Sequence, residues 1–381
     1  MIPQGWEEKS LYDIAEITTG KWDANHSVES GLYKFYTCAS EPLLCNTFRY
    51  CGDCLIFPGN GANVGDVYRY SGKFDAYQRT YVASNIKHIN VSYLYYFLLL
   101  YWKKANSDKQ YGSATNYIKI GNFKDFIISY PPLPEQERIV AKLDKAFEAI
   151  DKVKANAEKN LNNAKELFES ALNKSFMKNT DGWEEKTLGS ISDLKQNKAE
   201  VKNIDANTLV SFVPMEYLGI NQKYFNSNQS KPIKNLIKSY TYFAENDVIM
   251  AKITPCFENG KIGIARGLMN KIGFGSSEYI VFRTNKDINS EYLYYFLNRE
   301  TFRKEGAQNM LGAVGHKRVS KEFIENYPFL YPSLLEQQKI VEKLDALQEQ
   351  TKHLEQIYTQ KIKECDELKQ SILQKAFRGE L

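Results

Sequence analysis

The cysteines raise the first question of chemistry, because four of the six fall close together. These are Cys38, Cys45, Cys51 and Cys54, and the last two form a CxxC pair, which is one half of many zinc sites. Cys38 and Cys45 are too far apart to supply a second half, and Cys54 begins the apolar run CLIF, where a strand is expected. We therefore expect reduced, partly buried thiols of a reducing cytosol, with a metal site as the less favoured alternative.

The motifs of common enzymes are missing from the sequence. The four histidines show no HxxxH or HExxH spacing, no GxSxG is present, and the glycine-rich stretch at 59–66 lacks the Lys and Ser/Thr of a phosphate loop. The stretch YPPL at 130–133 is similar to the catalytic motif of amino-methyltransferases, but Tyr130 stands where an amide or acid must bind the amine. The sequence therefore predicts a binding protein, and an enzyme with a scattered active site stays open as an alternative.

Composition and charge leave several classes of partner open. Hydrophobic residues make up 43% and charged residues 25% of the chain, as in ordinary globular proteins. Lys and Arg exceed Asp and Glu by 50 − 46 = 4, a balance that neither demands nor excludes nucleic acid. The first ten residues lack a secretory signal, and the longest apolar run, 93–102, is half of a membrane span. We expect a soluble cytoplasmic protein without a membrane partner.

The most informative pattern is an internal repeat. GWEEKSLYDIAEI at 5–17 returns as GWEEKTLGSISDL at 182–194, YLYYFL at 93–98 returns at 292–297, and EQERIVAKLD at 135–144 returns as EQQKIVEKLD at 336–345. The landmarks keep their order while the sequence between them differs. This pattern indicates one duplicated scaffold, with functional variation inside each copy.

Each copy divides into a globular head and a long helix. Short β-type runs broken by Gly, Asn and Pro, together with one clear helix, predict two similar α+β domains, which we call head 1 (1–134) and head 2 (180–335). The segments 135–179 and 336–381 predict long helices, because prolines precede them and apolar residues recur in heptads. The predicted coiled-coil seam consists of Leu143, Phe147, Ile150, Leu161 and Phe168, then Leu344, Leu347, Leu354, Tyr358, Leu368 and Ile372.

Connectivity sets the expected arrangement of these parts. The chain order is head, helix, head, helix, so a second helix that packs along the first must run antiparallel to it. About 42 residues of helix span about 63 Å, and two heads related by a pseudo-two-fold axis suit DNA half-sites about one helical turn apart. The expected fold is therefore two α/β domains separated by a long antiparallel two-helix coiled coil.

Several of the repeated stretches resemble those of a known family. GWEEKSLYDIAEI, PPLPEQERIVAKLD and SILQKAFRGEL resemble the shared frame of the DNA specificity subunit of type I restriction-modification systems. The stretch FAENDVIMAKITPCFENGKIGIA, followed by GFGSSEYIVFR, is similar to one class of target recognition domain in that family. The corresponding stretch of head 1, CGDCLIFPGNGANVGDVYRY, departs from this class, so we expect head 1 to read a different half-site.

The resemblance implies a function without catalysis. Each head would read one part of a bipartite, asymmetric sequence of double-stranded DNA, and the helices would set the unread spacer. The helices would also dock two methyltransferase (modification) subunits, with restriction subunits joining outside. No cofactor is expected on this chain, because S-adenosylmethionine, ATP and Mg²⁺ belong to those partners.

Polar and basic residues near glycines are the candidate DNA contacts, since amides suit adenine and Arg or Lys suits guanine in the major groove. In head 1 they are Asn60, Asn63, Arg69, Gln78, Arg79, Ser113, Thr115, Asn116 and Lys119. In head 2 they are Lys252, Thr254, Asn259, Lys261, His316, Lys317 and Arg318. A scaffold joining two protein partners and a bifunctional methylase or nuclease are the alternatives.

Overall fold

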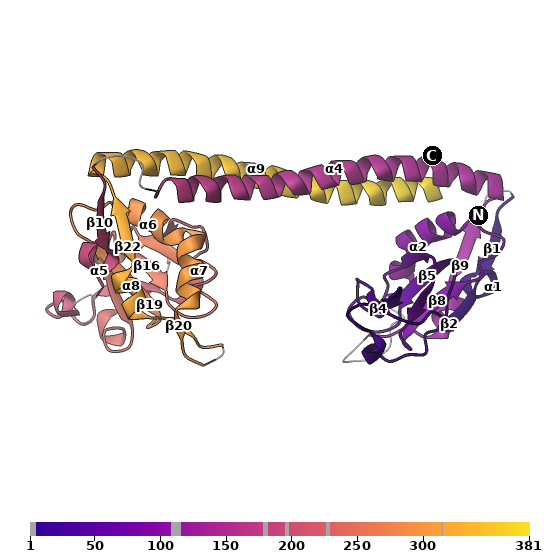
Figure 1. Cartoon of the computed structure of the whole chain (residues 1–381), viewed down its shortest axis with the longest axis horizontal. Helices are drawn as coiled ribbons and strands as arrows, with labels where there is room; N and C mark the ends of the chain where they lie inside the picture. Colours follow the sequence, from indigo (N-terminus) through magenta and orange to yellow (C-terminus); the bar gives the residue numbers. More distant parts are fainter. Residues whose placement is uncertain (1–4, 108–115, 178–181, 195–197, 226–228, 314) are drawn as a thin grey trace. The chain divides into compact units, whose positions relative to one another are not determined.

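The computed structural model describes residues 5–107, 116–177, 182–194, 198–225, 229–313 and 315–381. The chain forms two compact units (Figure 1). Unit 1 contains Met1–Glu158 and Thr359–Leu381, and unit 2 contains Lys159–Tyr358. Each unit therefore holds one head together with a part of both long helices. Within the described ranges, no helix combines the length and apolar character that crossing a bilayer requires.

Head 1 is built around β5 (Asp53–Pro58), whose residues from Cys54 to Pro58 are all buried. It is an inner strand of a four-stranded sheet with the order β2-β8-β5-β6, whose other members are β2 (Glu16–Thr19), β8 (Thr80–Ser84) and β6 (Tyr68–Ser71). A second sheet has the order β4-β3-β7, formed by β4 (Leu43–Cys45), β3 (Tyr33–Tyr36) and β7 (Phe74–Ala76).

Helix α2 (Val91–Asn106) supplies much of the core of head 1. It begins where the Asn90 side chain accepts the backbone N–H groups of Ser92 and Tyr93, which is a regular N-cap. Its buried Trp102 packs edge-on against Phe57 of β5, with ring centroids 5.1 Å apart. Within the repeated stretch YLYYFL, Tyr93, Leu94 and Leu98 are buried in this core. The short helices α1 (Leu11–Ile14), η1 (Ala24–His26) and α3 (Ile120–Lys124) complete the head.

Head 2 repeats this plan with a larger interior. Its buried strand β16 (Val248–Ala251) lies in a five-stranded sheet of order β11-β19-β16-β17-β13, with β11 (Ser192–Asp193), β19 (Tyr279–Thr284), β17 (Ile262–Ala265) and β13 (Tyr224–Phe225). A four-stranded sheet of order β14-β12-β18-β15 adds β14 (Ser230–Pro232), β12 (Leu209–Val213), β18 (Ile272–Gly275) and β15 (Thr241–Ala244). The helices are α5 (Leu188–Ile191), α6 (Ser290–Asn298), α7 (Glu300–Gln308) and α8 (Lys321–Asn326).

The sequence repeat reappears as repeated contacts. Strand β1 (Glu7–Ser10) pairs antiparallel with β9 (Ile127–Tyr130), and β10 (Glu184–Thr187) pairs in the same way with β22 (Pro328–Tyr331). Gln136 and Gln337 are both buried. Gln136 accepts the backbone N–H of Asn90, the N-cap of α2, and Gln337 accepts that of Asn289, the N-cap of α6, both at 2.8 Å. Tyr96 and Tyr295 donate to Asp144 and Asp345 of the long helices, each at 2.5 Å. The predicted α+β fold with a duplicated scaffold is confirmed.

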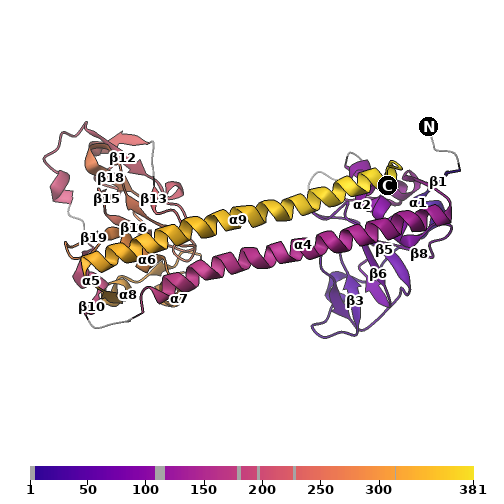
Figure 2. The same cartoon turned by 90° about the horizontal axis from the view of Figure 1, so that it is seen from above.

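The long helices are α4 (Leu133–Lys174) and α9 (Leu334–Phe377). In unit 1, Lys154 of α4 pairs with Asp366 of α9 at 2.7 Å, and Asp151 pairs with Lys369 at 2.5 Å. The earlier residue of α4 pairs with the later residue of α9, so the two helices run antiparallel. Figure 2 shows them side by side in this unit. In unit 2 both helices contribute to one hydrophobic core, through residues that include Phe168 and Leu344.

The predicted seam is partly wrong on α9. Leu143, Ile150, Phe168 and Leu344 are buried, and the half-buried members are Phe147, Leu161, Leu347, Tyr358 and Ile372. Leu354 and Leu368 are instead 36% and 49% exposed, while Leu373 and Ala376 are buried. Leu373 and Ala376 belong to the hydrophobic core of head 1, so burial at this end of α9 is set by packing on the head as well as by the partner helix.

Candidate nucleic-acid interface

In head 1, the loop after β5 lies against the segment that precedes α3. The Gly61 backbone N–H donates to the Asn116 carbonyl and the Ile118 N–H donates to the Gly59 carbonyl, both at 2.9 Å. A Cβ on Gly59 would lie 2.0 Å from the Arg79 carbonyl oxygen, so only glycine allows this close approach. Three segments that are distant in the sequence, 59–61, 78–80 and 116–118, therefore meet at one place.

A cavity of about 340 Å³ opens where these segments meet, and Asn60, Gln78 and Arg79 from the sequence prediction line it. The remaining lining residues are Thr19, Gly59, Tyr81, Tyr117 and Ile118. Gln78 and Arg79 are exposed. The structure thus gathers two amides and one guanidinium at a concave surface, which is the set of groups that hydrogen-bonds to base edges.

The other predicted residues of head 1 are placed differently. Asn63 donates to the Cys38 carbonyl at 2.8 Å, so its amide supports the loop. Arg69 forms two hydrogen bonds with the carboxylate of Asp53, at 2.8 and 2.5 Å, and a third with Ser92 at the start of α2. This hydrogen bonding to Asp53 raises the pKa of Arg69. The Lys119 ammonium lies 5.6 Å from the centre of the Tyr117 ring, and Ser113 and Thr115 lie outside the described residues.

Head 2 brings together the corresponding pair of segments. The loop after β16 contacts the hairpin of β20 (Met310–Leu311) and β21 (Arg318–Val319). The Thr254 N–H donates to the Lys317 carbonyl and the Val319 N–H donates to the Lys252 carbonyl, both at 2.9 Å. The candidates around 252–261 and around 316–318 therefore belong to one surface, on which Asn259, His316 and Lys317 are exposed.

Several basic groups of this surface have partners inside head 2. Arg318 makes two hydrogen bonds of 2.8 Å with Glu278, and these lower the pKa of the Glu278 carboxyl. Lys252 donates to the Ser277 carbonyl and Lys261 donates to the Met215 carbonyl, both at 2.9 Å. Thr254 donates to the Glu258 carboxylate at 2.7 Å. The side chains are therefore oriented before any ligand binds. Sequence reasoning missed Glu278, because its partner lies 40 residues away.

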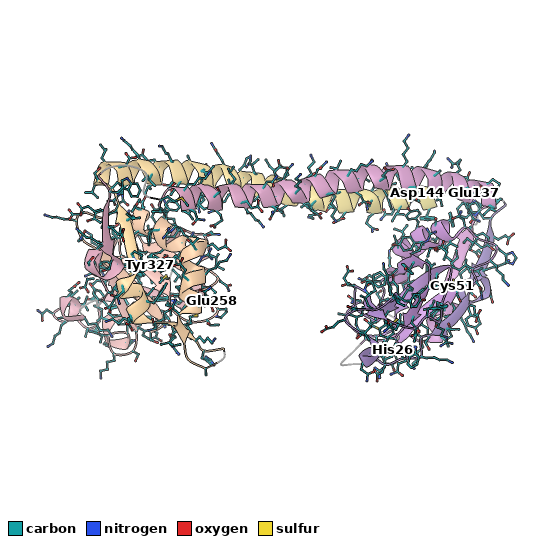
Figure 3. All side chains as sticks on the ribbon, viewed as in Figure 1. His26, Cys51, Glu137, Asp144, Glu258 and Tyr327 are labelled. Atoms are coloured by element: carbon teal, nitrogen blue, oxygen red, sulfur yellow. The ribbon has the colours of Figure 1, made fainter. Side chains whose placement is uncertain are left out.

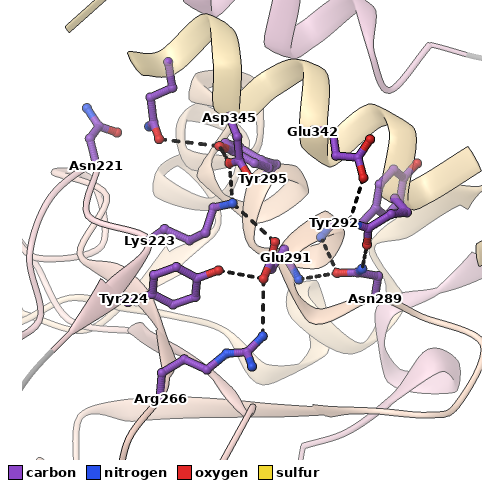
Figure 4. A network of polar contacts seen from close by, with 12 residues as sticks. Asn221, Lys223, Tyr224, Arg266, Asn289, Glu291, Tyr292, Tyr295, Glu342 and Asp345 are labelled. Carbon is purple, nitrogen blue, oxygen red and sulfur yellow. Dashed lines mark hydrogen bonds and ion pairs between the residues drawn. The ribbon is translucent and has the colours of Figure 1, made fainter.

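A polar network attaches head 2 to α9 (Figure 4). The Lys223 ammonium, whose side chain is 10% exposed, forms ion pairs with Glu291 of α6 and Asp345 of α9. Glu291 also accepts hydrogen bonds from Tyr224 at 2.6 Å and from Arg266 at 3.2 Å. Because the network joins β13, the residue after β17, α6 and α9, it fixes the orientation of head 2 on this part of the helix.

The structure offers little for metal or thiol chemistry. Within the part of the chain that the structure describes, no group of three His, Cys, Asp or Glu side chains is arranged to hold a metal ion. Cys51 is exposed, whereas Cys54 is buried in β5. Burial raises the pKa of the Cys54 thiol to about 11, so this thiol stays protonated at neutral pH.

Comparison with known proteins gives one consistent family. The model described as the type I restriction modification DNA specificity domain matches residues 3–163 and 180–364. The EcoAI specificity subunit of Escherichia coli is 39% identical over 177 residues, which are 46% of this chain and 30% of that protein. The EcoDI specificity subunit of Escherichia coli is 26% identical and covers 100% of this chain, and the match spans 89% of that protein.

Solved structures agree with this likeness at the level of the fold. A chain from a study of complex assembly and conformational transition of the type I R-M system has a TM-score of 0.73 at 18% identity, with full coverage of both chains. The HsdS subunit of Thermoanaerobacter tengcongensis has a TM-score of 0.52 at 18% identity, and covers 100% of this chain and 98% of its own.

Proposed function

This chain belongs to the type I restriction modification DNA specificity family, and we propose that each of its two heads reads one half of a bipartite, asymmetric sequence in double-stranded DNA. The two matches of the family model fall on the two halves of the chain, so the duplicated scaffold carries two specificity domains. The relatives are specificity subunits, and this chain is accordingly the recognition component of such a system rather than its catalyst.

The observation that carries the proposal is the equivalent surface in each head. In both heads, a loop that follows a largely buried strand lies against the segment that precedes a short helix. The interiors differ around this shared arrangement: Asn60, Gln78 and Arg79 gather in head 1, whereas head 2 presents Asn259, Lys317 and Arg318. Different groups at equivalent places are what two different half-sites require.

The long helices are proposed to carry the partner proteins and to set the unread spacer. Apolar side chains lie exposed on both helices: Val153 and Leu167 on α4, and Ile357 and Leu368 on α9, are 43%, 52%, 44% and 49% exposed. Val153 and Leu368 belong to unit 1, and Leu167 and Ile357 belong to unit 2, so each unit leaves apolar side chains of both helices open to a partner. We assign this surface to two methyltransferase subunits, with restriction subunits outside them, and S-adenosylmethionine, ATP and Mg²⁺ to those partners.

A domain exchange tests the proposal. Residues 182–335 are replaced by the second head of another specificity subunit, and the chimera is produced together with the methyltransferase subunits. Sequencing of methylated bases in the host genome is expected to show a new second half-site beside an unchanged first half-site. A change in both halves would show that the heads do not read independently. If the unmodified protein directed methylation without any sequence preference, the proposal that the heads read DNA would be wrong.

A further inference from the structure

One tryptophan in head 1 is held at the surface by a buried carboxylate. The Trp22 side chain is 42% exposed, yet its indole N–H donates to Asp75 at 3.0 Å. Asp75 is 1% exposed, and it also accepts the Thr47 hydroxyl at 2.7 Å and the Ala76 backbone N–H at 2.9 Å. The only polar atom of the indole is therefore satisfied inside the protein, and the exposed part of the ring is entirely apolar.

A histidine ring completes this arrangement. His26 stacks face to face on Trp22, with ring centroids 4.1 Å apart and planes within 3°. Its Nε2 lies 2.8 Å from the Thr47 hydroxyl oxygen. Because the single proton of that hydroxyl is donated to Asp75, the His26 Nε2 is the donor in this contact. We call the stacked pair of Trp22 and His26 the aromatic platform. Its rigidity means that little side-chain entropy is lost when a ligand covers it.

The aromatic platform adjoins the residues proposed to read DNA. The Gln78 backbone N–H donates to the Trp22 carbonyl at 2.8 Å, and Trp22 forms a parallel bridge with Tyr77. Gln78 and Arg79 then line the cavity described above. Figure 3 places His26 at the end of unit 1 away from the part of α4 that belongs to this unit.

The charge around the platform favours a nucleic-acid ligand. Lys21 precedes Trp22 and is exposed, and the exposed Asp23 that follows accepts the Ala24 N–H. The exposed Arg49 guanidinium donates to the carbonyl of Thr19, a residue that lines the cavity, at 3.1 Å. An apolar ring flanked by cations suits bases bordered by phosphates. Since the indole offers no free hydrogen-bonding group to a ligand, it can recognise a base only by apolar contact.

We propose that the aromatic platform is a specificity-determining element of head 1, and that the exposed indole of Trp22 recognises the 5-methyl group of a thymine in the major groove. This inference rests on the proposed function, because it adds one contact to the same DNA surface. The 5-methyl group is the apolar feature that distinguishes a T·A pair in that groove. The neighbouring Gln78 and Arg79 read hydrogen-bonding edges of the adjacent pairs.

The test compares thymine with uracil, which lacks only the 5-methyl group. Half-site 1 is first identified by methylome sequencing, and duplexes are then made with uracil replacing each thymine of that half-site in turn. We expect one replacement to weaken binding of the full complex with its methyltransferase subunits by about 5- to 150-fold, the range of one base-pair contact. A complex carrying Trp22→Ala should show the same loss on unmodified DNA and no further loss with uracil.

The controls separate folding from recognition. The uracil measurement on the unmodified protein needs no substitution, so misfolding cannot mimic its result. Trp22→Phe keeps an aromatic ring and should retain sensitivity to the methyl group. If no uracil weakens binding, or if Trp22→Ala retains the methyl sensitivity, the inference is overturned, and a loss of specificity in Arg79→Ala would then show that the proposed function still stands. Absence of any sequence-specific duplex binding would overturn both.

Discussion

A buried glutamine at the start of each long helix allows a sharp test of how the heads are attached. Gln136 is 1% exposed, its Oε1 accepts the Asn90 N–H at 2.8 Å, and its Nε2 donates to the Pro131 carbonyl at 2.7 Å. Replacement by leucine keeps the approximate volume but leaves both backbone groups without this partner. An unpaired buried polar group costs about 1–3 kcal/mol, and the Asn90 amide is only partly buried, so we expect Gln136→Leu to lose roughly 2–4 kcal/mol.

The assay is urea unfolding combined with hydrogen exchange at the first amides of α2. We expect Gln136→Leu to lower the midpoint of unit 1 and to speed exchange at Asn90. Glu137→Leu is the matched control, because Glu137 is the next residue and its side chain is exposed (Figure 3). Gln337→Leu should have the corresponding effect on unit 2 while the Asn90 amide stays protected. A loss below ~0.5 kcal/mol, typical of surface substitutions, together with unchanged exchange would refute this reasoning.

Further predictions follow from single sites. Arg79→Ala should cost about 1–3 kcal/mol at one position of half-site 1 only, measured by competition with duplexes that vary at each position; equal losses at all positions would indicate a phosphate contact instead. Insertion of four residues within 150–165 of α4 should lengthen the unread spacer and leave both half-sites unchanged, as read by methylome sequencing, and an unchanged spacer would count against the ruler role. Cys51 should react with a thiol reagent at pH 8 in the folded protein while Cys54 does not, because burial raises the pKa of Cys54 to about 11; equal labelling of the two, mapped by mass spectrometry, would contradict the buried position.

Local sequence signals were sufficient to predict the repeated frame. The caps, prolines and apolar repeats that begin α2, α4 and α9 act over a few residues, and the structure has these elements close to the predicted positions. The heptad rule failed at Leu368 because this end of α9 also packs on head 1, whose core takes in Leu373 and Ala376. Helix α9 continues to Phe377, and its residues Leu373 and Ala376 are buried. The helix was therefore predicted correctly, and the error lies in which of its residues were assigned to the seam.

The candidate site was harder to predict because its organisation depends on distant partners. Arg69 is typical of a phosphate-binding residue in its local context, but Asp53, 16 residues earlier, and Ser92 hold its guanidinium. Trp22 gave no local signal, since the carboxylate that orients it lies 53 residues away on β7. Pairing between strands decides these contacts, and the spacing of residues along one segment does not contain that information.

The two units also show how recognition can diverge without disturbing assembly. One set of contacts that fastens each head to a long helix uses residues of the repeated segments, as with Gln136 and Gln337 or Tyr96 and Tyr295, and head 2 adds the ion pair of Lys223 with Asp345. The sheets that carry the reading loops keep the same order of equivalent strands, but that of head 2 has one strand more, β13. Because these two sets of contacts share few residues, a change in a reading loop leaves the attachment intact. Specificity and docking are therefore physically separable within one unit, which is what a subunit needs if its target sequence is to change while its partners stay the same.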